Sequence, residues 1–117
     1  MPKILAAVVA IAAGALLAIP ALAAPTAQTV TVTEQDYAIR LSAPPRAGTV
    51  TFVVRNAGKS GHDLWIRGGG VTRKTRVLDR GGTARLTMTL RKGVRYQVWC
   101  GVGSHASKGM RTSFVAR

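Results

Sequence analysis

Four residues with metal-binding side chains occur in a pattern that could hold one metal ion. Cys100, His105 and Met110 follow one another at five-residue intervals, in a segment that also contains three glycines. Glycine permits left-handed backbone turns, which would fold this segment back on itself and bring the three side chains together. His62 is the only other histidine in the chain. We therefore expect His62 to complete a site with Cys100, His105 and Met110.

Two imidazoles, a thiolate and a weakly bound thioether are the donor set of a blue-copper electron-transfer site. Structural zinc sites use more cysteine or histidine and rarely methionine, so zinc fits less well. All four ligands come from the protein, and no open position for a substrate is evident. The expected cofactor is one copper ion alternating between Cu(I) and Cu(II), and we expect no enzyme activity.

Each of these residues also has an ordinary explanation when it is taken singly. A lone buried cysteine usually acts as a small apolar side chain, and a methionine usually fills space in a core. A histidine near a turn is commonly a surface residue. The shared spacing favours a site over these explanations, and Met110 is the member that core packing would explain most easily.

Short β-strands, with turn residues between them, are the elements that must position these side chains. Period-two alternation and β-branched residues predict strands, and Gly, Pro and Asn clusters predict the turns. The predicted strands are 29–33, 37–41, 48–55, 62–67, 71–78, 83–90, 94–100 and 111–116. The strand at 71–78 is polar and is expected at a sheet edge. Seven or eight such strands indicate an all-β, Greek-key β-sandwich or small barrel.

Alternation also predicts which side chains face the core. In the strand at 83–90, the inward set is Ala84, Leu86, Met88 and Leu90. In the strand at 94–100, the inward set is Val94, Tyr96, Val98 and Cys100. The Cys100 thiol is therefore expected to point inward at the end of its strand.

The first 23 residues are typical of an export signal. Lys3 precedes an apolar run, and Ala21 and Ala23 are small residues at the positions that a signal peptidase requires. We expect cleavage after Ala23, leaving residues 24–117 as one copper-binding domain in the periplasm or outside the cell. The alternative is a membrane anchor formed by residues 4–19, which are slightly too few to cross a bilayer.

The chain is strongly basic, with 17 Lys and Arg residues against 4 Asp and Glu. A positive protein is attracted to anionic partners, such as redox proteins with acidic docking surfaces or, more weakly, an anionic membrane surface. An exported protein seldom meets nucleic acid, and the chain has few aromatic residues for base stacking, so no nucleic-acid partner is expected. The cations are scattered, as on an ordinary solvated surface. We expect a monomer.

The sequence resembles the cupredoxins, the group that includes plastocyanin, azurin, auracyanin and phytocyanin. Phe52 to Gly58, followed by Gly61-His62-Asp63, is similar to the family's first-ligand strand and turn. Leu90 to Cys100 is similar to its penultimate hairpin, and Cys-x4-His-x4-Met to its last ligand loop. The resemblance covers the whole of residues 24–117 and implies a cupredoxin-like fold. It also implies that His105 lies near the surface, where electrons enter and leave.

The chain departs from the family beside the first ligand. Many relatives have Asn after that histidine, where the amide ties the two ligand loops together, whereas this chain has Asp63. A carboxylate cannot donate a hydrogen bond unless protonated, so the tie is expected to be reversed, weakened or pH-dependent. Asn56 and Asp63 are the residues expected to support the ligands from behind.

The function predicted from these observations is electron transfer. An exported mononuclear type 1 copper protein would shuttle one electron between larger redox proteins. The alternative is a periplasmic copper chaperone or scavenger without an electron-transfer role. A module for adhesion or membrane-surface binding, with incidental copper, is a third candidate.

Overall fold

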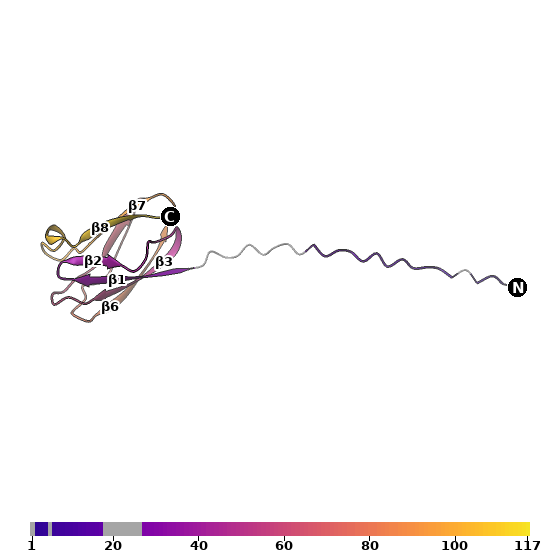
Figure 1. The fold of residues 1–117 in the computed structure, drawn as a ribbon, viewed down its shortest axis with the longest axis horizontal. Helices are drawn as coiled ribbons and strands as arrows, with labels where there is room; N and C mark the ends of the chain where they lie inside the picture. The colour runs from indigo at the N-terminus through magenta and orange to yellow at the C-terminus, as the bar shows by residue number, and fades with distance from the viewer. Residues whose placement is uncertain (1, 5, 18–26) are drawn as a thin grey trace.

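The computed structural model describes residues 2–4, 6–17 and 27–117 (Figure 1). Residues 2–4 and 6–17 form neither helix nor strand. In the described part of the chain, no helix is long and apolar enough to cross a membrane. The expected cleavage point after Ala23 lies outside the described residues.

Residues 27–117 form two four-stranded β-sheets. The elements in chain order are β1 (Gln28–Gln35), β2 (Ala38–Leu41), β3 (Gly48–Asn56), β4 (Trp65–Gly68), β5 (Val71–Lys74), β6 (Thr83–Leu90), β7 (Arg95–Trp99), the 3-10 turn η1 (Ala106–Lys108) and β8 (Arg111–Val115). One sheet has the strand order β2-β1-β3-β6 and the other has the order β5-β4-β7-β8. β1 and β3 are parallel, and the other paired strands are antiparallel. The predicted all-β sandwich is confirmed.

The core lies between the two sheets, because each long strand alternates apolar and polar residues. β1 and β3 run side by side in register, with Val30 opposite Phe52 and Val32 opposite Val54. These four side chains are fully buried. Tyr96 and Val98 of β7 are buried in the same core. The inward faces predicted for the strands at 83–90 and 94–100 are therefore confirmed, with Ala84 and Val94 partly rather than fully buried.

Two of the predicted strands have an end that lies three or more residues from the predicted position. The strand predicted at 62–67 begins only at Trp65, because His62 forms an isolated bridge with Leu78 instead of joining the β4 ladder. The strand predicted at 71–78 ends at Lys74. After it, the Thr75 hydroxyl accepts the Leu64 N–H and donates to the Arg76 carbonyl, which turns the chain. β5 is an edge strand, as predicted.

One end of the sandwich gathers three connections. Since β1 and β3 are parallel, the β1–β2 turn and the loop after β3 leave their sheet at the same end. Trp65 at the start of β4 pairs with Trp99 at the end of β7, which brings the β3–β4 and β7–β8 connections together. Figure 1 shows the β1–β2 turn and the η1 loop at this end of the domain. The candidate ligands lie in these connections.

Candidate metal centre

His62, Cys100 and His105 meet at this end of the sandwich. His62 Nδ1 lies 3.1 Å from His105 Nδ1. Cys100 Sγ lies 3.8 Å from each of these two nitrogens. His62 and Cys100 are buried, and His105 is partly exposed. The structure therefore brings three of the four predicted ligands together, although 38 residues separate His62 from Cys100.

These three atoms fit a metal ion. By plane geometry, the point equidistant from the two nitrogens and the sulfur lies about 2.1 Å from each atom, and zinc is bound at about 2.0–2.1 Å by nitrogen and about 2.3 Å by sulfur. A thiolate with two imidazoles in a trigonal arrangement, and a methionine nearby, fits copper better than zinc.

Two antiparallel backbone hydrogen bonds hold His62 in place. The His62 N–H donates to the Leu78 carbonyl at 3.0 Å, and the Leu78 N–H donates to the His62 carbonyl at 2.7 Å. The Asn56 amide donates to the carbonyls of Ser60 and Leu78, and its oxygen accepts the Gly58 N–H. Asn56 thus supports the loop that precedes His62 and does not touch the ligands' polar atoms.

The loop from Cys100 to Met110 closes on itself. The Cys100 N–H donates to the Met110 carbonyl at 3.0 Å, and the Met110 N–H donates to the His105 carbonyl at 3.1 Å. Met110 is fully buried. These bonds keep the Met110 backbone beside Cys100 and His105, and its role as the fourth ligand remains a prediction.

The glycines of this loop serve two different purposes. Gly103 and Gly109 have φ angles of +47° and +121°, so they make the left-handed turns that the sequence predicted. Gly101 does not. A Cβ atom there would lie within about 3 Å of the Trp65 indole, so the glycine allows that ring to approach the backbone. Trp65 in turn stacks on Trp99, next in the chain to Cys100, at a ring separation of 5.7 Å.

Asp63 ties the two ligand loops together as a hydrogen-bond acceptor. Its Oδ1 accepts the Gly101 N–H at 2.6 Å, and its Oδ2 accepts the Trp65 indole N–H at 3.1 Å. Both oxygens of Asp63 accept hydrogen bonds, so the tie is reversed relative to an asparagine that donates. This is one of the outcomes expected from the sequence.

Replacing Asp63 with alanine should destabilise this end of the domain. The Gly101 N–H and the Trp65 indole N–H, which are only partly buried, would lose their acceptor. The cost should therefore lie near the lower end of the roughly 1–3 kcal/mol of an unsatisfied buried group. Urea unfolding of D63A, with D79A as a control that removes an exposed carboxylate, measures the loss. Equal stability of the two variants would contradict the assigned role of Asp63.

Asp36, in the β1–β2 turn, was not identified from the sequence. Its Oδ1 lies 2.6 Å from His62 Nε2, on the side of the imidazole that faces away from Cys100. Burial raises the pKa of Asp36, but hydrogen bonds from His62 and from the Ser60 and Lys59 N–H groups more than offset this and lower the pKa overall. Asp36 is therefore a carboxylate at neutral pH.

Tyr37 of the same turn was also left without a role in the sequence analysis. Its ring lies 5.1 Å from the His105 ring, and Lys108 Nζ lies 4.8 Å from the Tyr37 ring centre. The β1–β2 turn thus contacts both imidazoles, His62 through Asp36 and His105 through Tyr37.

Glu34 is a second carboxyl that the sequence analysis missed. It is fully buried, and neither carboxyl oxygen has a hydrogen-bond partner among the described residues. Burial, together with the negative charge of Asp63, raises the pKa of Glu34 to about 8. Glu34, Asp36 and Asp63 are three of the four acidic residues in the chain. Their common location could not be predicted from the sequence, because it depends on which strands and loops lie side by side.

The Cys100 thiol is protonated in the metal-free protein at neutral pH. Burial raises the pKa of this thiol, and hydrogen bonds from nearby backbone groups offset only part of the increase. A metal ion binds the thiolate, so binding must release the proton.

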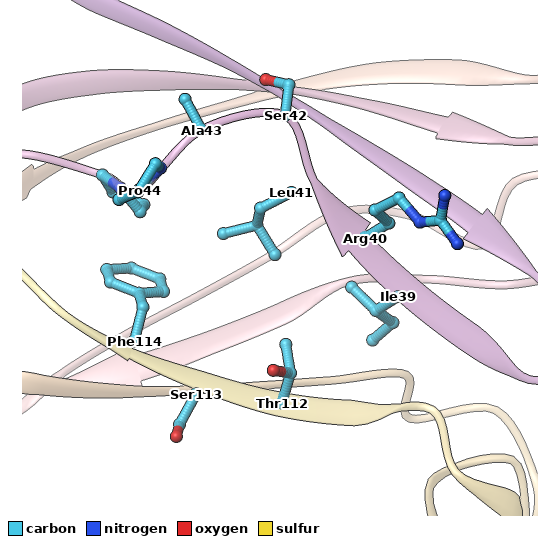
Figure 2. Close-up of a pocket in the computed structure, with 10 residues that line it drawn as sticks. Ile39, Arg40, Leu41, Ser42, Ala43, Pro44, Thr112, Ser113 and Phe114 are labelled. Atoms are coloured by element: carbon cyan, nitrogen blue, oxygen red, sulfur yellow. The ribbon is translucent and has the colours of Figure 1, made fainter.

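A groove lies away from these residues. It has a volume of about 450 Å³ and opens between the edge strands β2 and β8. Figure 2 shows Leu41 and Phe114 on its opposite sides. None of the four predicted ligands lines it, and it contains no cysteine, histidine or carboxylate.

No family model matches the chain, and no curated protein matches it. Solved structures do match. A reduced auracyanin from Roseiflexus castenholzii has a TM-score of 0.60 and 17% identity, with 80% of this chain and 98% of that chain covered. Auracyanin A from Chloroflexus aurantiacus, described as a "blue" copper protein, has a TM-score of 0.66 and 15% identity, with 78% and 99% covered.

Reduced rusticyanin matches as well, with a TM-score of 0.61 and 18% identity over 80% of this chain and 81% of that chain. Auracyanins and rusticyanin are cupredoxins. At identities this low, the likeness establishes the fold, and the chain has the cupredoxin fold.

Proposed function

We propose that this chain, folded as a cupredoxin, is an exported mononuclear type 1 copper protein that carries single electrons between redox partners. The observation that supports this most strongly is the triangle formed by Cys100 Sγ and the Nδ1 atoms of His62 and His105. When bound, copper would supply the one-electron Cu(II)/Cu(I) couple.

The protein's own side chains would bind the ion and keep water away from it. Cys100, His62 and His105 would hold the ion, and Met110 is the proposed fourth ligand. His62, Cys100 and Met110 are almost completely buried, which limits access of solvent and of small substrates. A site of this kind suits electron transfer, because its ligands are already close together before the ion arrives. We therefore propose no enzyme activity.

His105 is the proposed point of contact with a redox partner. It is the one member of the triangle that reaches the surface. Lys108 follows it in η1, and Lys59 is exposed in the loop whose backbone holds Asp36. Positive side chains on the loops at this end of the domain support a partner with an acidic docking surface, with association rates that fall as salt rises.

Location outside the cytoplasm is part of the proposal. The signal-like first 23 residues support export to the periplasm or beyond. A compartment of that kind is oxidising, and the chain's one cysteine would be protected there as a copper ligand and by burial.

Addition of Cu(II) to the purified protein tests the proposed function. A type 1 site should give an intense blue absorption band and a narrow copper hyperfine splitting, because the thiolate shares electron density with the ion. Stoichiometry should reach one copper per chain. Reduction by dithionite should bleach the band, and reoxidation should restore it.

Two other results would count against electron transfer. A pale product with the wide hyperfine splitting of a tetragonal site would place copper elsewhere on the protein. Binding of Cu(I) alone, with no stable Cu(II) form, would favour a copper chaperone or scavenger.

A further inference from the structure

We propose that Asp36 is a positioning residue for His62, whose carboxylate accepts the Nε2 proton, turns the Nδ1 lone pair toward Cys100 and His105, and biases the site toward Cu(II). This inference rests on the proposed copper function. It concerns a residue of the β1–β2 turn, which contributes no ligand.

The two nitrogens of the His62 ring face different groups. Nε2 lies 2.6 Å from Asp36 Oδ1, and Nδ1 lies 3.1 Å from His105 Nδ1 and 3.8 Å from Cys100 Sγ. A neutral imidazole carries one proton, and a carboxylate can only accept. The proton therefore belongs on Nε2, and Nδ1 is left free to bind a metal.

The Asp36 carboxylate is itself fixed by the backbone. Its Oδ2 accepts the Lys59 N–H at 3.1 Å, and its Oδ1 accepts the Ser60 N–H at 3.2 Å. Lys59 and Ser60 belong to the loop that leads to His62. The same loop thus orients both the histidine and the carboxylate that holds it.

Gly58 makes this close approach possible. A Cβ atom at Gly58 would overlap Asp36 Oδ1 and would lie 2.9 Å from His62 Nε2. No larger residue fits without moving one of these partners. The contact is thus built into two segments of chain, the β1–β2 turn and the loop before His62, and does not depend on one flexible side chain.

A carboxylate that accepts the imidazole proton strengthens metal binding more than a neutral acceptor does. Hydrogen bonding to an anion raises the basicity of the ligating imidazole, and outer partners of this kind typically contribute 10- to 100-fold to metal affinity. The negative charge also stabilises an ion of charge two more than an ion of charge one. Asp36 should therefore strengthen Cu(II) binding more than Cu(I) binding.

Two substitutions separate orientation from charge. In D36A, His62 Nε2 loses its acceptor, whereas in D36N the side-chain carbonyl can still accept the proton but the charge is gone. D79N is the matched control, since it removes one exposed carboxylate from the same chain. The thermal unfolding of all variants is measured first, and the near-isosteric D36N serves if D36A does not fold.

The first readout needs no metal. Imidazole nitrogen NMR of the metal-free protein at mildly alkaline pH should show His62 as the Nε2–H tautomer in the wild type, D36N and D79N. D36A should show a mixture of tautomers. The second readout is competition titration, in which D36N and D36A should bind Cu(II) about 10- to 100-fold more weakly, with a smaller loss for Cu(I).

A fixed Nε2–H tautomer in D36A would overturn the orienting role. An unchanged ratio of Cu(II) to Cu(I) affinity in both Asp36 variants would overturn the bias toward Cu(II). Failure of the proposed function has a different signature, because a wild type that binds no copper still reports the His62 tautomer by NMR.

Discussion

Replacing Cys100 with serine is expected to abolish the blue absorption band and to weaken copper binding by more than the roughly 10- to 100-fold typical of outer partners. A serine hydroxyl does not ionise near neutral pH, and its oxygen is a poor match for the soft Cu(I) ion. The two histidines that remain would hold Cu(II) as a pale site. Absorption and copper-competition titrations measure both effects.

Ser104 supplies the matched control for this substitution. It lies in the same loop as Cys100, and it is exposed. S104A should keep the colour and the affinity of the wild type. A C100S protein that remains blue and binds copper normally would show that the site has been assigned to the wrong residues.

Glu34 should make the stability of the metal-free protein fall as pH rises. Its pKa is about 8 in the folded protein, compared with an ordinary value of 4.5. Between these values the folded state holds a proton that the unfolded state releases, so raising the pH favours unfolding. Its contribution is complete below about pH 4.5 and is lost as the pH rises through about 8.

The maximum slope for one such group is about 1.4 kcal/mol of unfolding free energy per pH unit. Urea unfolding of the metal-free protein across this range measures it, because metal affinity then plays no part. E34Q keeps the shape of the side chain and carries no charge, so the slope should largely disappear. At alkaline pH, E34Q should be more stable than the wild type.

D79N serves as the control for this experiment, since it removes an exposed carboxylate and should keep the slope of the wild type. If E34Q and the wild type lose stability in parallel, Glu34 is not the group responsible. The unpaired carboxyl oxygens of Glu34 explain why the effect should be large, because no hydrogen bond compensates for burying the charge.

The three acidic residues at this end of the domain differ in what their carboxyl groups do. Asp63 and Asp36 accept hydrogen bonds from groups that belong to the ligand loops or to a ligand. Glu34 has no such donor within residues 27–117 or the other described stretches, and burial keeps it protonated. The difference follows from the presence or absence of N–H groups at each position.

The sequence alone determined the fold class and the candidate ligands. Period-two alternation is a local property of each strand, so segments such as 83–90 were predicted with their inward faces. Two histidines and one cysteine leave few combinations, and the short Cys100-to-Met110 loop brings its own residues together. Strand alternation and ligand spacing are properties of residues close together in the chain, so they can be read from the sequence.

Only the tertiary structure decided how the site is supported. Asp36 meets His62 across 26 residues, and Asp63 meets Gly101 across 38. Such contacts depend on the parallel pairing of β1 with β3 and on the alignment of β4 with β7, which set three loops at one end of the sandwich. Side-chain type and spacing identify atoms that could bind a metal. The groups that orient those atoms come from distant parts of the sequence, and the pairing of the strands decides which of these parts lie beside the ligands.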